Sequence, residues 1–103
     1  MTDLWGVPPE VIMGEAGICS FLAMVAVAYV YQRNPQMNGW HDCPNDRARL
    51  AAGLWWLFQD PSRGARFVFS VDDLRLKGVR EIVQGVGPPR ARFRCAVGGL
   101  VFY

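Results

Sequence analysis

The stretch that decides the fold covers residues 11–34 and reads VIMGEAGICSFLAMVAVAYVYQRN. One acidic residue, Glu15, stands in it, directly before the most hydrophobic segment of the chain. A Pro-Pro-Glu sequence precedes the stretch, and a helix is expected to begin there because proline is tolerated in a first helical turn. Val11, Ile12 and Glu15 then share one helix face, since residues three and four apart are neighbours.

That face is apolar except for the carboxyl group of Glu15. Apolar surroundings disfavour a carboxylate, so we expect the pKa of Glu15 to be raised. A carboxyl group that stays protonated near neutral pH is what a general acid needs. The same pattern is equally compatible with an acid at a frayed helix end that points into water, and the pattern alone leaves both interpretations open.

A second helix is predicted over Phe21–Arg33, with Ser20 as its N-cap. This helix is apolar on every side, so it should run through the core, where its alanines let neighbouring elements pack closely. The apolar run is shorter than the roughly 20 residues that span a bilayer, and no membrane span is expected. A signal peptide begins with a basic leader, whereas the charged residues before this run are acidic. No signal peptide is therefore expected.

Composition indicates a folded domain. The chain has 103 residues, of which 51% are hydrophobic and 19% charged, so we expect one domain over residues 1–103. The formal charge is only +2, but all 11 basic residues lie from Arg33 onward, a distribution that suits an anionic polymer as partner. Cys19, Cys43 and Cys95 are odd in number and widely spaced, which indicates free thiols rather than a disulfide framework.

A third helix is predicted over residues 45–58. Its periodicity places an apolar stripe on the inward side and Arg47 and Arg49 on the outside. The residues of the predicted stripe are Leu50, Leu54, Leu57 and Phe58.

The second half of the chain predicts turns and short strands. Asp60 and Pro61 hold the first two positions of a turn over residues 60–64, and residues 66–69 follow as a short strand. Residues 70–73 can cap a brief helical turn, and a last strand is expected over residues 100–103. The chain therefore predicts three helices followed by a small sheet.

Two pairs of residues have both a functional and a structural interpretation. His41 and Cys43 could bind a metal, but a zinc site takes three or four ligands and the chain has no second histidine. The favoured interpretation is that both are ordinary loop residues. A Cys-His nucleophilic pair is as weakly supported as a metal site, because a spacing of two residues rarely brings these groups within hydrogen-bond distance. Trp55 and Trp56 could stack on a sugar ring, but aromatic residues on a helix more often belong to the core.

Arg90, Arg92 and Arg94 alternate with less polar residues, as in a half-exposed strand. Such a row could contact phosphates. A solvated sheet face is the favoured interpretation, because no aromatic stacking platform accompanies the row. Nucleic acid is therefore not expected as a partner, although steeply salt-dependent binding would support one.

Three segments, taken together, resemble a known family. The first is Gly14-Glu15-Ala16 followed by residues 25–34, which is similar to GEARGE followed by AVAxVxxNR. Residues 60–69 (DPSRGARFVF) resemble Asp-Pro-Thr-x-x-Ala-x-Tyr/Phe-x-Phe, and residues 97–103 (VGGLVFY) resemble Ile-Gly-x-His-x-Phe-Tyr. These are motifs of the SleB-type cell wall hydrolases. The resemblance implies a lysozyme-like, lytic-transglycosylase-like fold, peptidoglycan as substrate and Glu15 as the catalytic acid.

Several positions depart from the family pattern. Cys19 stands where the family has its second motif glutamate, Leu100 stands where it has a histidine, and Arg33-Asn34 reverses or shifts its Asn-Arg pair. Hydrolysing glycosidases use two carboxyl groups. A lytic transglycosylase needs only one, because the C6 hydroxyl of muramic acid is the nucleophile. The resemblance therefore favours a lyase over a hydrolase.

The sequence thus predicts an α+β domain that cleaves peptidoglycan, with no cofactor and no metal. Glu15 is the predicted catalytic residue. Arg33 could hold a peptide carboxylate or orient Glu15, and a solvated position at the helix end, where a cation suits the helix dipole, is an equally favoured interpretation. Phe67 and Phe69 are expected at or under the floor of the cleft, where a core position is favoured for Phe69 over a substrate platform. Asp60 and Ser62 are expected to fix the turn at the rim of the cleft, and for Asp60 a turn-forming role is favoured over a sugar contact. The predicted substrate-binding residues are Arg33, Asp60, Ser62, Phe67 and Phe69.

A second hypothesis is a non-catalytic peptidoglycan-binding or structural module. Such a module could belong to a phage or secretion assembly. Both hypotheses place the protein at the bacterial cell wall, and a phage-encoded or virion-associated origin is compatible with either.

Overall fold

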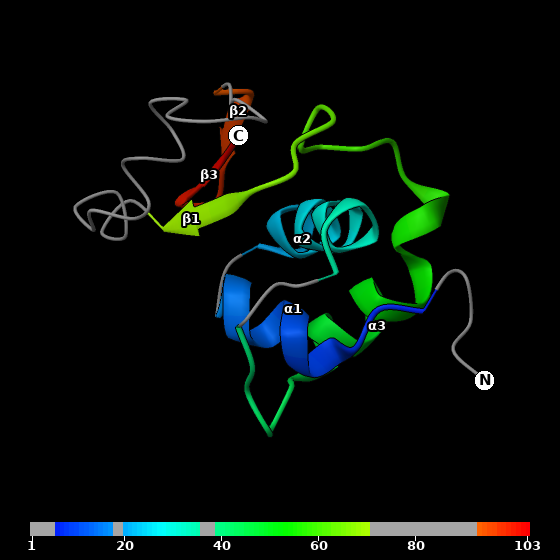
Figure 1. Cartoon of the computed structure of the whole chain (residues 1–103). Helices are drawn as coiled ribbons and strands as arrows, with labels where there is room; N and C mark the ends of the chain where they lie inside the picture. Colours follow the sequence, from blue (N-terminus) through cyan, green and yellow to red (C-terminus); the bar gives the residue numbers. More distant parts are fainter. Residues whose placement is uncertain (1–5, 18–19, 36–38, 71–92) are drawn as a thin grey trace.

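Three helices precede a small sheet in the part of the chain that the structure describes. The computed structural model describes residues 6–17, 20–35, 39–70 and 93–103. The α+β architecture predicted from the sequence is confirmed (Figure 1). In chain order its elements are α1 (Pro9–Ala16), α2 (Phe21–Arg33), α3 (Asp46–Leu54), the 3₁₀ turn η1 (Trp55–Leu57), β1 (Val68–Ser70), β2 (Cys95–Val97) and β3 (Leu100–Phe102).

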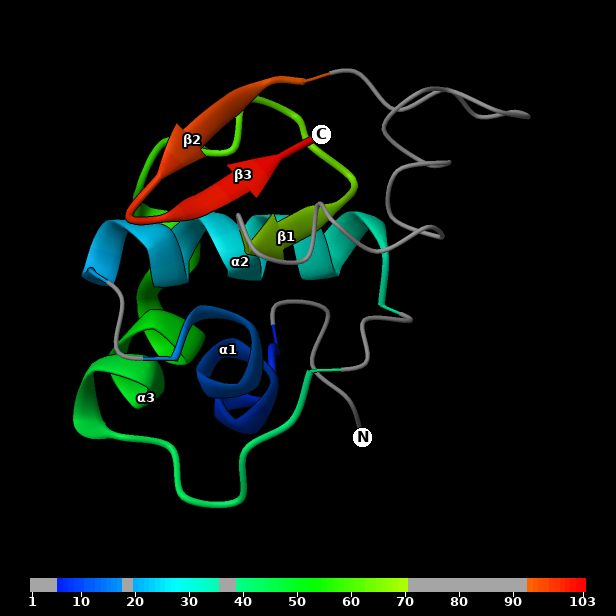
Figure 2. The same ribbon diagram turned by 90° about the vertical axis from the view of Figure 1, so that its left-hand side faces the viewer.

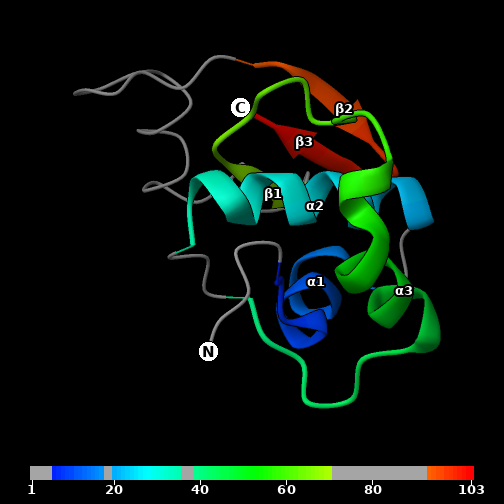
Figure 3. The ribbon, with the colours of Figure 1, turned by 90° about the vertical axis from the view of Figure 1, so that its right-hand side faces the viewer.

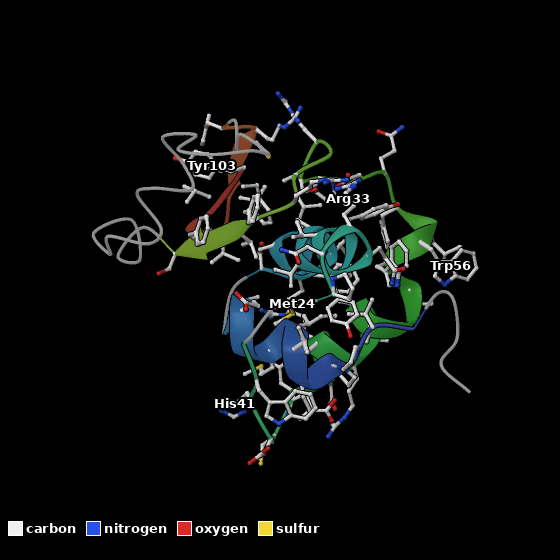
Figure 4. All side chains as sticks on the ribbon, in the orientation of Figure 1. Met24, Arg33, His41, Trp56 and Tyr103 are labelled. Carbon is white, nitrogen blue, oxygen red and sulfur yellow. The ribbon has the colours of Figure 1, made fainter. Side chains whose placement is uncertain are left out.

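Helix α2 is the central element. The sheet covers one side of it, and α1 and α3 lie on the opposite side (Figures 2 and 3). Met24 lies between α2 and α1 (Figure 4) and is completely buried. A helix covered on both sides has little surface left for polar residues, which explains its composition and confirms that it runs through the core. Its buried residues are Ala23, Met24, Val25, Ala26, Val27, Ala28 and Val30.

The starts of the helices follow from local chemistry. Pro9 occupies the first turn of α1, where its missing N–H removes no helical hydrogen bond. The hydroxyl of Ser20 accepts a hydrogen bond from the N–H of Ala23 at 3.2 Å, so the predicted N-cap of α2 is confirmed. Asn45 caps α3 in the same way, accepting from the N–H of Ala48 at 2.8 Å.

The inward stripe predicted for the third helix is wrong. Leu50, Leu54, Leu57 and Phe58 are between 38% and 59% exposed. The buried side of α3 consists instead of Ala48 and Ala51, and Trp55 follows them in η1. Small side chains let α3 approach α1 and α2 closely, whereas leucines at those positions would hold the helices apart.

The two tryptophans differ in exposure. Trp55 is buried against the ring of Tyr29, with ring centroids 4.8 Å apart in an edge-on arrangement. Trp56 is half-exposed and points away from the domain (Figure 4). The core interpretation is therefore right for Trp55 and wrong for Trp56.

The sheet is antiparallel, with strand order β1-β3-β2. Val68 pairs with Phe102, and Cys95 pairs with Phe102 on the other edge of β3. Gly98 and Gly99 join β2 to β3 with φ values of 55° and 84°, and a two-residue hairpin turn of this kind favours glycine at both positions.

The expected last strand is confirmed as β3. The strand expected over residues 66–69 is β1, which is shifted two residues towards the C-terminus at its start. Arg94 is exposed next to β2. Arg90, Arg92 and residues 71–73 of the expected helical turn lie outside the described residues.

In the described ranges no single helix is long and apolar enough to cross a membrane. Helices α1 and α2 reach that length and hydropathy only when they are taken together, across a bend of 118°.

Candidate active site at the end of the first helix

Glu15 lies in the last turn of α1 and is half-buried. The backbone N–H of Gly39 donates a hydrogen bond to its Oε1 atom at 2.8 Å. On the same helix Val11 and Ile12 are buried, as the shared face predicts. The carboxyl group is therefore fixed against another segment, which differs from an acid that points into water at a frayed helix end.

Two glycines allow this contact. At Gly14 a Cβ atom would lie 2.2 Å from the backbone nitrogen of Trp40. At Gly39 a Cβ atom would lie 2.4 Å from Oε1 of Glu15 and 2.6 Å from its Cδ. All three distances are shorter than the contacts that Cβ atoms make in proteins. The helix and the segment after α2 thus meet backbone against backbone, with the carboxyl group of Glu15 packed on Gly39.

The segment at residues 39–41 runs back along α1. Gly39 contacts Glu15, Trp40 contacts Gly14, and the N–H of His41 donates to the carbonyl oxygen of Glu10 at 3.0 Å. The segment therefore contacts the last turn of α1 at Gly14 and Glu15 and its first turn at Glu10, which fixes the position of the Gly39 N–H group.

His41 and Cys43 interact with each other in this loop. The N–H of Cys43 donates to Nδ1 of His41 at 3.2 Å, which agrees with the loop interpretation. Within the described ranges, no three His, Cys, Asp or Glu side chains gather into a possible metal site. Cys43 and Cys95 are free thiols, as predicted, and Cys19 lies outside the described residues.

Arg33, Asp60 and Ser62 form one cluster between the end of α2 and the loop before β1 (Figure 4 labels Arg33). The guanidinium of Arg33 forms an ion pair with Asp60 and donates to the Ser62 hydroxyl at 3.1 Å and to the carbonyl oxygen of Ala65 at 3.0 Å. Ser62 is fully buried. Its N–H and its hydroxyl both donate to Oδ1 of Asp60, at 2.8 and 2.6 Å.

These bonds explain the turn predicted at residues 60–64. Asp60 accepts from the backbone of Ser62 and from the N–H of Gly64 at 3.0 Å, the usual way in which aspartate stabilises a turn. Arg33 then ties the turn to the core helix. The geometry gives Asp60 and Ser62 the turn-fixing part of their predicted role, while the substrate contacts predicted for them and for Arg33 stay predictions.

The cluster also shifts a pKa. Burial alone would raise the pKa of the Asp60 carboxyl group, but hydrogen bonds from Ser62, Arg33 and the N–H of Gly64 outweigh it and hold this pKa below the ordinary 3.8. Because the folded-state pKa is lowered, the group stabilises the fold above its unfolded pKa. That stabilisation is lost as the pH falls through the folded value.

We therefore expect Asp60→Asn to lower the free energy of unfolding at pH 7 by about 2 kcal/mol, because it leaves Arg33 and Ser62 poorly paired. Denaturant titrations at pH 7 and pH 3 should show that the difference in free energy of unfolding between variant and wild type is smaller at pH 3. Asp46→Asn is the control, since Asp46 is almost fully exposed. If Asp60→Asn lowers the free energy of unfolding equally at both pH values, the role assigned to the Asp60 carboxylate is contradicted.

Phe67 and Phe69 lie on the outer face of the sheet. Val68 faces the core, and side chains alternate along a strand. The two phenyl rings are parallel within 7°, with centroids 6.3 Å apart, and Phe69 also contacts Tyr103 at 6.2 Å. Both rings are half-buried. The cleft-floor position predicted for them stays a prediction.

The structure thus brings together three of the predicted residues, Arg33, Asp60 and Ser62, and places Glu15 against a segment that sequence reasoning missed. No role was assigned to Gly39 from the sequence. No local signal in the sequence marks Gly39, because its contact with Glu15 depends on the path of the loop from α2 back to α1.

Three helices followed by a three-stranded antiparallel sheet form an α+β structure of lysozyme-like fold. Two solved structures share this fold. The catalytic domain of the Bacillus cereus SleB protein superimposes with a TM-score of 0.66 at 17% identity, over 96% of this chain and 88% of that one. The catalytic domain of the germination-specific lytic transglycosylase SleB from Bacillus anthracis gives a TM-score of 0.65 at 18% identity, over 91% of this chain and 88% of that one.

No protein-family model matches the chain, and no curated protein matches it. At 17–18% identity the two structural matches establish the fold. The fold implied by the resemblance to SleB-type proteins is thus supported. The shared fold covers more than 90% of this chain and 88% of each matched chain.

Proposed function

We propose that this protein is a peptidoglycan-cleaving glycosidase, acting as a lytic transglycosylase with Glu15 as its general acid and base. The observation that carries the proposal is the position of Glu15 at the end of α1, held by the N–H of Gly39 at 2.8 Å, in a fold shared with two SleB catalytic domains. A fixed carboxyl group can act in both directions of proton transfer.

The proposed reaction uses one carboxyl group twice. Glu15 first donates its proton to the glycosidic oxygen as the bond from that oxygen to C1 of muramic acid breaks. The resulting carboxylate then accepts the proton of the C6 hydroxyl, whose oxygen bonds to C1 of the same sugar. The nucleophile is tethered to the reacting carbon, so attack gains from proximity. No water is consumed, and the product ends in an anhydro sugar.

The other predicted residues receive supporting roles in this proposal. Phe67 and Phe69 offer half-buried rings on which a sugar ring or a peptide stem could rest. Arg33, Asp60 and Ser62 hold the loop before β1 in place, so their effect on substrate is proposed to act through the shape of that loop.

A release and sedimentation assay tests this function. Purified peptidoglycan incubated with the protein is expected to lose soluble muropeptide fragments into the supernatant. If the protein sediments with peptidoglycan and releases no fragments, the non-catalytic wall-binding module is the correct function. If the protein neither sediments nor releases fragments, both functions are excluded.

One observation favours keeping the wall-binding alternative in the test. Leu100, at the position where the SleB-type pattern has a histidine, is buried in β3. A buried leucine supplies no polar group to a substrate, so any reaction here proceeds without that imidazole.

A further inference from the structure

The backbone of a second segment donates a hydrogen bond to the carboxyl group of Glu15. The donor is the N–H of Gly39, which is 24 residues later in the chain. A backbone donor has no rotamer freedom of its own, so its direction is set by how its segment is anchored. Two neighbouring contacts anchor this segment, namely the backbone of Trp40 against Gly14 and the bond from His41 to Glu10.

The absence of a side chain at position 39 also determines where the carboxyl group of Glu15 lies. A Cβ atom there would meet Oε1, Cδ and Cγ of Glu15 at 2.4, 2.6 and 2.8 Å, and these are its three nearest atoms. Gly39 does not have the left-handed backbone conformation found at Gly17, Gly64 and the hairpin glycines. Backbone conformation therefore permits alanine at position 39, and the carboxyl group of Glu15 is what excludes it.

We propose that Gly39 is a positioning residue for Glu15, which aims the carboxyl group with its N–H and leaves the space that the group occupies. The proposal rests on the proposed function, because it concerns the residue assigned as the acid. It deepens that function by giving the segment at residues 39–41 the task of orienting the reacting group, which nothing in the sequence pattern had assigned to it.

The variant that tests this is Gly39→Ala. The three atoms nearest to its Cβ atom all belong to the flexible side chain of Glu15, from Cγ outward, and none is a backbone atom. The protein should therefore fold, and the carboxyl group should turn away. We expect kcat for fragment release to fall by roughly 10- to 100-fold, since small misplacements of a reacting group cost rates of this order. KM should change little. Gly53→Ala is the matched control, because nothing lies within 4 Å of a Cβ atom there.

A second measurement uses the unaltered protein and needs no activity. In ¹⁵N-labelled protein the amide proton of Gly39 is expected to shift with pH as its acceptor, the carboxyl group of Glu15, titrates. The same resonance should lose that shift in Glu15→Gln. Wild-type kcat in Gly39→Ala, or a Gly39 amide that ignores the titration, would overturn the proposal.

The two proposals can fail separately. If Glu15→Gln is inactive while Gly39→Ala is fully active, the positioning role is wrong and the proposed function stands. If Glu15→Gln keeps full activity, the proposed function itself is wrong, whatever the behaviour of Gly39.

Discussion

Glu15→Gln is expected to lower the rate of fragment release from peptidoglycan by roughly 10²–10⁴-fold, the usual contribution of a general acid or base. Glutamine has nearly the same shape and can still accept the hydrogen bond from Gly39 through its carbonyl oxygen. It cannot donate an acidic proton to a glycosidic oxygen or accept one from a hydroxyl. The variant should therefore fold normally and lose only its chemistry.

Glu10→Gln is the matched control for this change. Glu10 lies in the first turn of the same helix, and its described contact to the loop uses its backbone carbonyl, which accepts from His41. Thermal unfolding should show that wild type, Glu15→Gln and Glu10→Gln are all folded, and only Glu15→Gln should lose activity. Equal release by Glu15→Gln and wild type would remove Glu15 from the mechanism.

Gly14→Val is expected to have the largest effect on stability. A Cβ atom at position 14 would lie 2.2 Å from the backbone nitrogen of Trp40 and 2.5 Å from the carbonyl carbon of Gly39. Backbone atoms cannot turn aside as a side-chain end can, so α1 and the segment at residues 39–41 must separate. Overpacking of this kind costs about 3 kcal/mol or more, a large part of the 5–15 kcal/mol that typically stabilises a domain.

Denaturant titration measures this loss directly. Gly53→Ala again serves as the control and should raise stability slightly, because alanine is the better helix former in α3. Activity of Gly14→Val should fall even under conditions where it is folded, since the N–H of Gly39 that donates to Glu15 is displaced. A variant as stable as wild type would show that the close approach of the two backbones is not needed.

The sequence predicted the first two helices well, for a physical reason. Prolines before Val11 and the hydroxyl of Ser20 are local signals that mark helix starts, and the all-round apolar composition of Phe21–Arg33 can be satisfied only in a core. The third helix was also predicted, but its inward side was predicted wrongly, because its leucines have the helical period while its alanines make the buried contacts. Periodicity counts large apolar residues, whereas close helix contact selects small ones.

The candidate site was predicted only in its local part. Glu15 could be found because its carboxyl group interrupts an apolar face, and the turn at Asp60 could be found from its own chemistry. The contact with Gly39 depends on a loop that returns to α1 after α2, and no local signal encodes which segment a loop approaches. The cluster of Arg33 with Ser62 was missed for the same reason, since the two residues are far apart in sequence.

The most direct test is the mass of the sugar ends released from purified peptidoglycan by wild type and by Glu15→Gln. Intramolecular attack by the C6 hydroxyl predicts wild-type fragments that end in anhydro-muramic acid, one water lighter than reducing ends, and no fragments from the variant. Anhydro fragments in equal yield from both proteins, or intact glycan strands after treatment with wild type, would contradict a catalytic role for Glu15.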